Sequence, residues 1–125
     1  MARILIVEDN PDNMKLFRAV LEPRGHGVTG LASGDGLHET LEGARPELVL
    51  MDIQLPGRDG YELLADIRNS RWAGVRVVAL TAHAMTGEKE RAFGAGFDGY
   101  ITKPIDIAAF PRQIARALEG HPPGD

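Results

Sequence analysis

Short runs of apolar residues alternate with longer, more polar stretches along the chain of 125 residues. Five of these runs are brief and bounded by turn residues, as is typical of strands buried on both faces of a parallel sheet. The weakest run, at residues 28–31, is expected at an edge of the sheet. The expected strands lie at residues 4–7, 28–31, 48–51, 75–80 and within 96–101.

The segments between these runs carry apolar residues at helical spacing. Asn10 is a good N-cap residue and Pro11 suits the first helical position, so the first helix should begin there and end near Pro23. Met85 is expected on the apolar stripe of the fourth helix, and Ile107 on that of the last. The other helices are expected at residues 35–42, 60–70, 85–94 and 107–118. This alternation predicts an α/β domain whose parallel sheet is covered by helices on both faces.

A polar residue follows four of the five predicted strands, and only the edge strand lacks one. These residues are Asp9, Asp52, Thr81 and Lys103, after the first, third, fourth and fifth strands. In a flavodoxin-like sheet of order 2-1-3-4-5, those four strands are neighbours and the second strand lies at the edge. The pattern therefore predicts a doubly wound (βα)5 fold whose polar residues share the rim where ligands bind.

The residue types at this rim indicate a particular chemistry. Asp52 could simply begin a turn, but Glu8 and Asp9 would place two more acids beside it. Carboxylates this close repel one another unless a cation joins them, and a set without His or Cys favours Mg²⁺. Lys103 and Thr81 could then hold phosphoryl oxygens. The set predicts phosphoryl transfer onto Asp52 as the nucleophile.

Four motifs in this order resemble the receiver domains of two-component response regulators, over nearly the full length. They are Val7-Glu8-Asp9-Asn10, Met51-Asp52-Ile53-Gln54-Leu55-Pro56-Gly57 with Asp59-Gly60, Leu80-Thr81-Ala82, and Lys103-Pro104. Each motif is weak alone, and the four together are specific. The segment at residues 12–17 also resembles a single-domain cell-cycle regulator of this family.

The resemblance implies a role for each matching residue. Asp52 would be the phosphorylated residue, and Thr81 and Lys103 would contact the phosphoryl group. Thr81 and Tyr100 would form the switch, with the aromatic ring turning inward as the threonine moves. The implied Mg²⁺ ligands are Glu8, Asp9, Asp52 and the backbone carbonyl of Gln54.

The expected function is that of a stand-alone receiver at residues 1–119, followed by a mobile tail at residues 120–125. It would accept a phosphoryl group from a histidine kinase or phosphotransfer protein and then change its binding to a downstream protein. It would be a switch rather than a conventional enzyme, catalysing its own phosphorylation and dephosphorylation. A receiver excised from a longer regulator or hybrid kinase is the alternative reading.

Two other classes of protein also fit part of the pattern. A phosphatase of the haloacid-dehalogenase type uses an aspartate nucleophile, but it normally carries a second aspartate where this chain has Gln54. A flavodoxin-like nucleotide or flavin binder would be expected to carry a glycine-rich phosphate loop after the first strand, and none is present.

Composition narrows the possible partners and compartment. The net charge of -4 argues against nucleic acid as a partner. No apolar run approaches the ~20 residues that a membrane-spanning helix needs. The first strand begins too near the N-terminus to leave room for a signal peptide, and the chain has no cysteine. A cytoplasmic location without membrane attachment is therefore expected.

Overall fold

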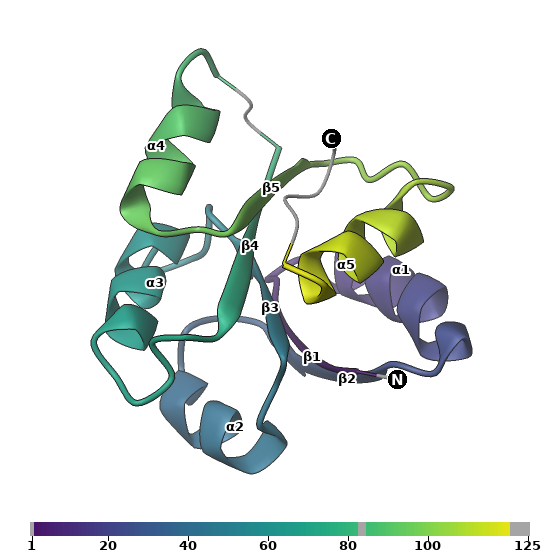
Figure 1. Cartoon of the computed structure of the whole chain (residues 1–125), viewed down its shortest axis with the longest axis horizontal. Helices are drawn as coiled ribbons and strands as arrows, with labels where there is room; N and C mark the ends of the chain where they lie inside the picture. The colour runs from purple at the N-terminus through teal and green to yellow at the C-terminus, as the bar shows by residue number, and fades with distance from the viewer. Residues whose placement is uncertain (1, 83–84, 121–125) are drawn as a thin grey trace.

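The computed structural model describes residues 2–82 and 85–120 of the chain. Within these residues, five parallel strands form one sheet in the order β2-β1-β3-β4-β5 (Figure 1). This order, and the place of β2 at an edge, confirm the predicted flavodoxin-like topology. The strands are β1 (Arg3–Val7), β2 (Gly27–Leu31), β3 (Leu48–Asp52), β4 (Arg76–Thr81) and β5 (Gly99–Thr102).

Helices cover both faces of the sheet (Figure 1). One face carries α1 (Pro11–Leu21) and α5 (Phe110–Leu118), and a short 3-10 helix, η1 (Glu22–Arg24), follows α1. The opposite face carries α2 (Leu37–Ala44), α3 (Gly60–Arg68) and α4 (Glu88–Ala95). Asn10 caps α1 as predicted, because its side chain accepts hydrogen bonds from two backbone N–H groups of the first turn.

The alternation of side chains along each strand divides the core into two layers. Ile4 and Ile6 of β1 pack on one side with Phe17 of α1 and Phe110 of α5. The rings of those two phenylalanines stack with centroids 5.6 Å apart. Leu5, between the two isoleucines, packs on the opposite side beneath α2 and α3. Continuous apolar runs are needed here because both faces of the central strands are buried.

The fourth helix begins later than its apolar spacing predicts. Gly87 has φ 84°, in the left-handed region, and α4 starts only at Glu88. Met85 therefore lies before the helix and is 73% exposed, so its predicted place on the apolar stripe is wrong. At the other end, Gly96 has φ 113° and ends α4, which delays β5 until Gly99.

The last helix also starts later than predicted. The side chain of Asp106 accepts hydrogen bonds from the backbone N–H groups of Ala108 and Ala109, at 3.0 and 3.3 Å, and holds a turn there. The helix begins at Phe110, and Ile107 is 58% exposed rather than on its buried stripe. The remainder of the predicted stripe does face the sheet, with Phe110 and Ile114 fully buried.

Among the described residues, no helix combines the length and apolar content needed to span a membrane. Of the tail predicted at residues 120–125, only Gly120 falls within the described residues.

Candidate functional site

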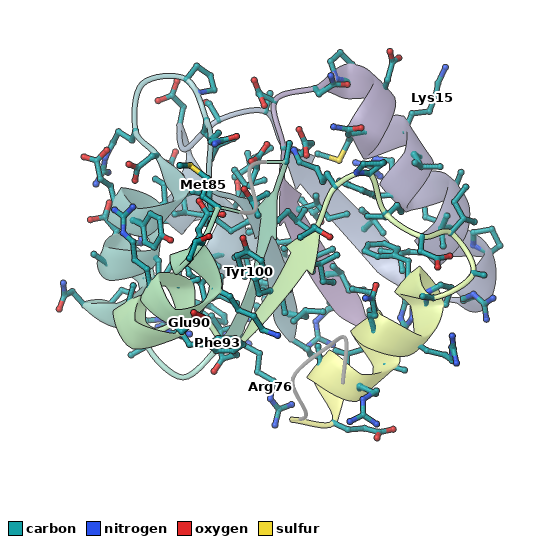
Figure 2. All side chains as sticks on the ribbon, turned by 90° about the horizontal axis from the view of Figure 1, so that it is seen from above. Lys15, Arg76, Met85, Glu90, Phe93 and Tyr100 are labelled. Carbon is teal, nitrogen blue, oxygen red and sulfur yellow. The ribbon has the colours of Figure 1, made fainter. Side chains whose placement is uncertain are left out.

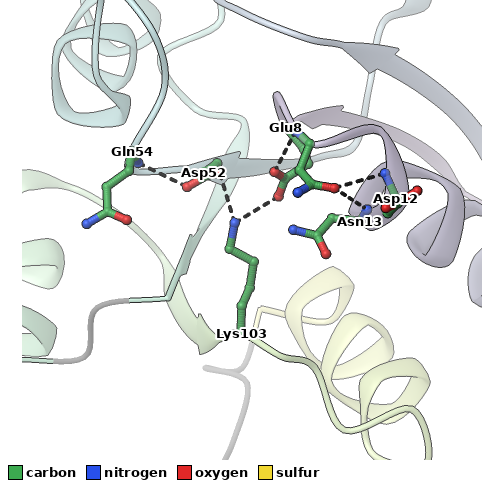
Figure 3. A network of polar contacts seen from close by, with 7 residues as sticks. Glu8, Asp12, Asn13, Asp52, Gln54 and Lys103 are labelled. Atoms are coloured by element: carbon green, nitrogen blue, oxygen red, sulfur yellow. Dashed lines mark hydrogen bonds and ion pairs between the residues drawn. The ribbon is translucent and has the colours of Figure 1, made fainter.

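The carboxyl edge of the sheet brings together side chains that are far apart in the sequence. Glu8 follows β1, Asp52 ends β3 and Lys103 follows β5. The Nζ atom of Lys103 donates hydrogen bonds to Asp52 Oδ2 at 2.9 Å and to Glu8 Oε1 at 3.0 Å (Figure 3). The strand order therefore joins residues that are 51 and 95 positions apart in the chain.

This cluster is largely removed from solvent. The side chains of Glu8 and Asp52 are 0% and 3% exposed, and that of Lys103 is 12% exposed. Two buried carboxylates thus share one ammonium group. Asp9, the next residue along, is exposed and adds a third carboxylate at the mouth of the cluster. The site is negatively charged overall and would attract a cation.

Burial and charge pairing shift pKa values within the cluster. Burial raises the pKa of Glu8, and the hydrogen bonds it accepts from Lys103 and from the backbone N–H of Asn10 offset this only in part. For Lys103, burial lowers the pKa, but the hydrogen bonds to Asp52 and Glu8 outweigh it and leave the pKa above its ordinary value. The lysine is therefore charged at neutral pH.

Backbone groups orient these side chains. The N–H of Gln54 donates to Asp52 Oδ1 at 3.0 Å, which fixes the carboxylate at the strand exit. The N–H of Asn10 donates to Glu8 Oε2 at 3.1 Å. The N–H of Lys103 donates to the carbonyl of Thr81 at 2.7 Å, so the end of β4 holds the backbone from which the lysine extends. The peptide bond between Lys103 and Pro104 is cis.

Gly60 packs closely against the backbone of Asp52, and the pattern of apolar and polar residues did not predict this contact. A Cβ atom at this position would lie 2.6 Å from the carbonyl oxygen of Asp52 and 2.8 Å from Cα of Ile53. The N–H of Gly60 donates to the carbonyl of Ile53 at 2.8 Å, and Asp59 caps α3 beside it. Only glycine lets the first turn of α3 approach the end of β3 this closely.

The acidic residues have the chemistry and spacing of a divalent-cation site. One carboxylate oxygen from each of Glu8, Asp9 and Asp52 lies within 4.8 Å of the other two. These oxygens face a pocket of about 410 Å³. Three carboxylates without a His or Cys in the set fit Mg²⁺, which binds a few carboxylates and keeps several water ligands. The pocket is lined by Glu8, Asp9, Asn10, Asn13, Asp52, Gln54, Ala82, Lys103 and Pro104.

The two predicted switch residues lie on the adjacent strands β4 and β5. Thr81 is fully buried at the end of β4. Tyr100 of β5 is half-buried and lies against α4 (Figure 2), where its hydroxyl donates to Glu88 Oε1 at 2.6 Å. Burial, and then this carboxylate, raise the pKa of Tyr100 well above its ordinary value.

Two residues near the site were not anticipated from the sequence. Asn13 lines the pocket from the first turn of α1, and Glu88 binds Tyr100. Asn13 lies three residues after Asn10, which is helical spacing, and this could have indicated a shared face. The Glu88 contact has no comparable sequence signal, since it depends on how α4 packs beside β5.

A five-stranded sheet of this order, with an acidic trio and a lysine at its carboxyl edge, defines the class of the receiver domains of two-component signalling. The match to known families agrees. The family described as response regulator receiver domain matches residues 4–115, and the chain belongs to it. This assignment favours a signalling switch over the phosphatase and flavin-binding classes.

Proteins with similar sequences include both short and long chains. The chain is 39% identical to the polar-differentiation response regulator DivK of Brucella anthropi, over 92% of its own length and 94% of the DivK chain. It is 38% identical to the sensor protein GacS of Pseudomonas syringae, over 93% of its own length but only 13% of GacS. The chain thus spans a small part of GacS and nearly all of DivK.

A solved structure also resembles this chain in fold and sequence. The receiver domain of a sensor histidine kinase from Pseudomonas aeruginosa superimposes with a TM-score of 0.84 and 36% identity, covering 94% of this chain and 98% of that one. That protein holds a magnesium ion coordinated in its active site cleft.

Proposed function

We propose that this domain accepts a phosphoryl group on Asp52. The observation that carries the proposal is the contact of Lys103 Nζ with the buried Asp52 carboxylate, at 2.9 Å, in a pocket that also holds the acidic pair. An oxygen of Asp52 attacks the phosphorus of a phosphohistidine, the phosphorus–nitrogen bond breaks, and its electron pair remains on the leaving imidazole. Hydrolysis of the aspartyl phosphate later resets the domain.

Lys103 and Thr81 would hold the transferred group. Phosphorylation adds about -1.5 to -2 charges at Asp52. The ammonium of Lys103 already contacts this carboxylate and can pair with a phosphoryl oxygen without leaving the site. The hydroxyl of Thr81, one strand away at the same edge, would donate a hydrogen bond to another oxygen. Together they offset charge that the buried site could not otherwise accommodate.

Mg²⁺ is the cofactor that the donor set fits. Glu8, Asp9, Asp52 and the backbone carbonyl of Gln54 would hold it. When bound, the cation would offset the repulsion between Asp52 and an anionic phosphodonor.

Phosphorylation would change the positions of Tyr100 and α4, and a downstream protein would detect this change. Movement of Thr81 toward the phosphoryl group would vacate space beside β5, and Tyr100 would turn into it. That turn requires the hydrogen bond from Tyr100 to Glu88 to break, so phosphorylation and the position of α4 would be coupled. Among the residues of α4, only Ala92 is fully buried, which suits an element of low local stability.

The partner that supplies the phosphoryl group would be a histidine kinase or phosphotransfer protein. A groove of about 410 Å³ lies between α1 and the segment leading into α5. It is lined by Ala19, Val20, Pro23, Arg24, Ile107 and Pro111. The exposed Ile107 adds apolar surface to the lining of this groove, which a helix of the partner would cover. The similarity to DivK over 94% of that chain supports a stand-alone role, with a downstream protein as the target.

Labelling with a small phosphodonor tests the assignment of Asp52. We expect acetyl phosphate with Mg²⁺ to label the wild-type chain, and chelation of Mg²⁺ to abolish the labelling. Asp52→Asn should abolish it, and Asp9→Asn should weaken it strongly. The exposed Asp35, in the loop before α2, provides a matched Asp35→Asn control that should label normally. Equal labelling of the Asp52→Asn variant would refute the proposal.

A further inference from the structure

The pocket beside Asp52 is lined by the polar side chain of Asn13, which the proposed chemistry does not use. Asn13 is half-buried in the first turn of α1, and its carboxamide points into the pocket on the side of Lys103 (Figure 3). It makes no side-chain hydrogen bond to any other residue that the structure describes.

Two other polar groups of the pocket, the ammonium of Lys103 and the side-chain oxygen of Asn10, already have hydrogen-bond partners. The ammonium of Lys103 is held between Asp52 and Glu8. The side-chain oxygen of Asn10 caps α1 by accepting the N–H groups of Asp12 and Asn13, at 2.9 and 3.0 Å. The carboxamide of Asn13 is thus a neutral N–H donor that faces the pocket, and no hydrogen bond to another described side chain has to break before it binds a ligand.

An anionic donor that approaches this pocket meets three carboxylates. A neutral amide can donate a hydrogen bond to a phosphoryl oxygen there without adding charge. It would act before the group is transferred, whereas Lys103 neutralises the product. Val20 in the groove between α1 and α5 lies seven residues after Asn13, so both lie on one face of α1. A partner bound in that groove would bring its phosphohistidine next to Asn13.

We propose that the Asn13 carboxamide binds a phosphoryl oxygen of the incoming phosphodonor and so aids its approach to Asp52. This inference rests on the proposed function. Phosphoramidate is the simplest donor with the same phosphorus–nitrogen bond as phosphohistidine. The phosphorus–nitrogen bond breaks, its electron pair stays on nitrogen, and ammonia leaves from the protonated amino group as Asp52 bonds to phosphorus. Asn13 neither gains nor loses a proton.

Labelling by phosphoramidate at saturating Mg²⁺ tests the inference. The second-order rate constant should fall about three- to tenfold in Asn13→Ala, the effect of losing one neutral hydrogen bond. It should fall further in Asn13→Asp, which keeps the shape but replaces the donor with a negative charge. Asn69→Ala makes the same chemical change at an exposed position at the end of α3 and should label like the wild type. Unfolding curves would check that each variant folds.

Mg²⁺ affinity, measured by calorimetry without a phosphodonor, separates donor binding from cation binding. Asn13→Ala should leave this affinity unchanged. If the affinity falls by the same factor as the labelling rate, Asn13 acts through the cation and the inference is wrong. It is equally wrong if Asn13→Ala labels like the wild type. Failure of the wild-type chain to label at Asp52 would instead refute the proposed function.

Discussion

Lys103 Nζ lies 2.9 Å from Asp52 Oδ2, although the two residues are 51 positions apart and extend from different strands. The contact exists because β3, β4 and β5 lie side by side and point the same way. It also pairs two charges that would each be costly to bury alone. The stability of the site and its proposed chemistry therefore depend on the same pair.

Removing the lysine charge should destabilise the fold. Lys103→Met keeps the aliphatic chain but leaves Glu8 and Asp52 buried without a cation, so the free energy of unfolding should fall by about 3 kcal/mol at neutral pH. Denaturant titration with a chelator present would measure this. Adding Glu8→Gln should recover part of the loss. Lys15→Met, at an exposed position on α1, should change stability little (Figure 2). Equal stability of the two lysine variants would contradict the account.

The packing of Gly60 against the end of β3 predicts opposite effects for two Gly→Ala substitutions. Gly60→Ala should lower the free energy of unfolding by about 1–3 kcal/mol, because its Cβ would lie 2.6 Å from the Asp52 carbonyl oxygen. Gly43→Ala in α2 has open space around its Cβ and should raise stability by roughly 0.5–1 kcal/mol through helix propensity. Denaturant titration of both variants provides the comparison. A stabilising Gly60→Ala would show that α3 does not pack as described.

The hydrogen bond between Tyr100 and Glu88 can be followed by the pH titration of the phenol. Burial and Glu88 favour the neutral hydroxyl, so Tyr100 should ionise well above its ordinary pKa. Glu88→Ala should bring that pKa down. Ultraviolet absorbance of the phenolate measures it, in a Tyr61→Phe background, because the chain has only two tyrosines.

Because the pKa of Tyr100 is higher in the folded chain than in the unfolded chain, the free energy of unfolding should depend on pH. The unfolded chain loses the Tyr100 proton first as pH rises, so the folded state should lose stability between the ordinary pKa and the raised one. Glu88→Ala should weaken this loss. Glu90→Ala, an exposed position on the same helix, should change the titration only slightly. A titration that is the same with and without Glu88 would exclude this contact in solution.

Much of the fold and of the site arrangement could be predicted from the sequence, because the evidence lay in patterns along the chain. Uninterrupted apolar runs indicated strands buried on both faces, and polar residues such as Asp52 and Lys103 marked their ends. Once β2 was assigned to the edge, the order of the other strands brought those ends together. The convergence of these residues is thus largely a consequence of topology.

The errors arose where local backbone geometry overrides apolar spacing. Met85 and Ile107 fit helical periodicity, but Gly87 and the turn at Asp106 delay the two helices and leave both side chains exposed. The position of Asn13 in the pocket, the Glu88 contact and the close approach at Gly60 depend on side-chain direction and helix packing. Periodicity carries no information on either.

Mapping the phosphoryl group on the wild-type chain tests the central claim most directly. After reaction with acetyl phosphate and Mg²⁺, borohydride reduction converts an aspartyl phosphate to homoserine, and peptide mass spectrometry then locates the change. We predict a single modified residue, Asp52, with Asp9 and the other acids unchanged. Homoserine at any other aspartate, or none after the phosphoryl group has been incorporated, would contradict the account.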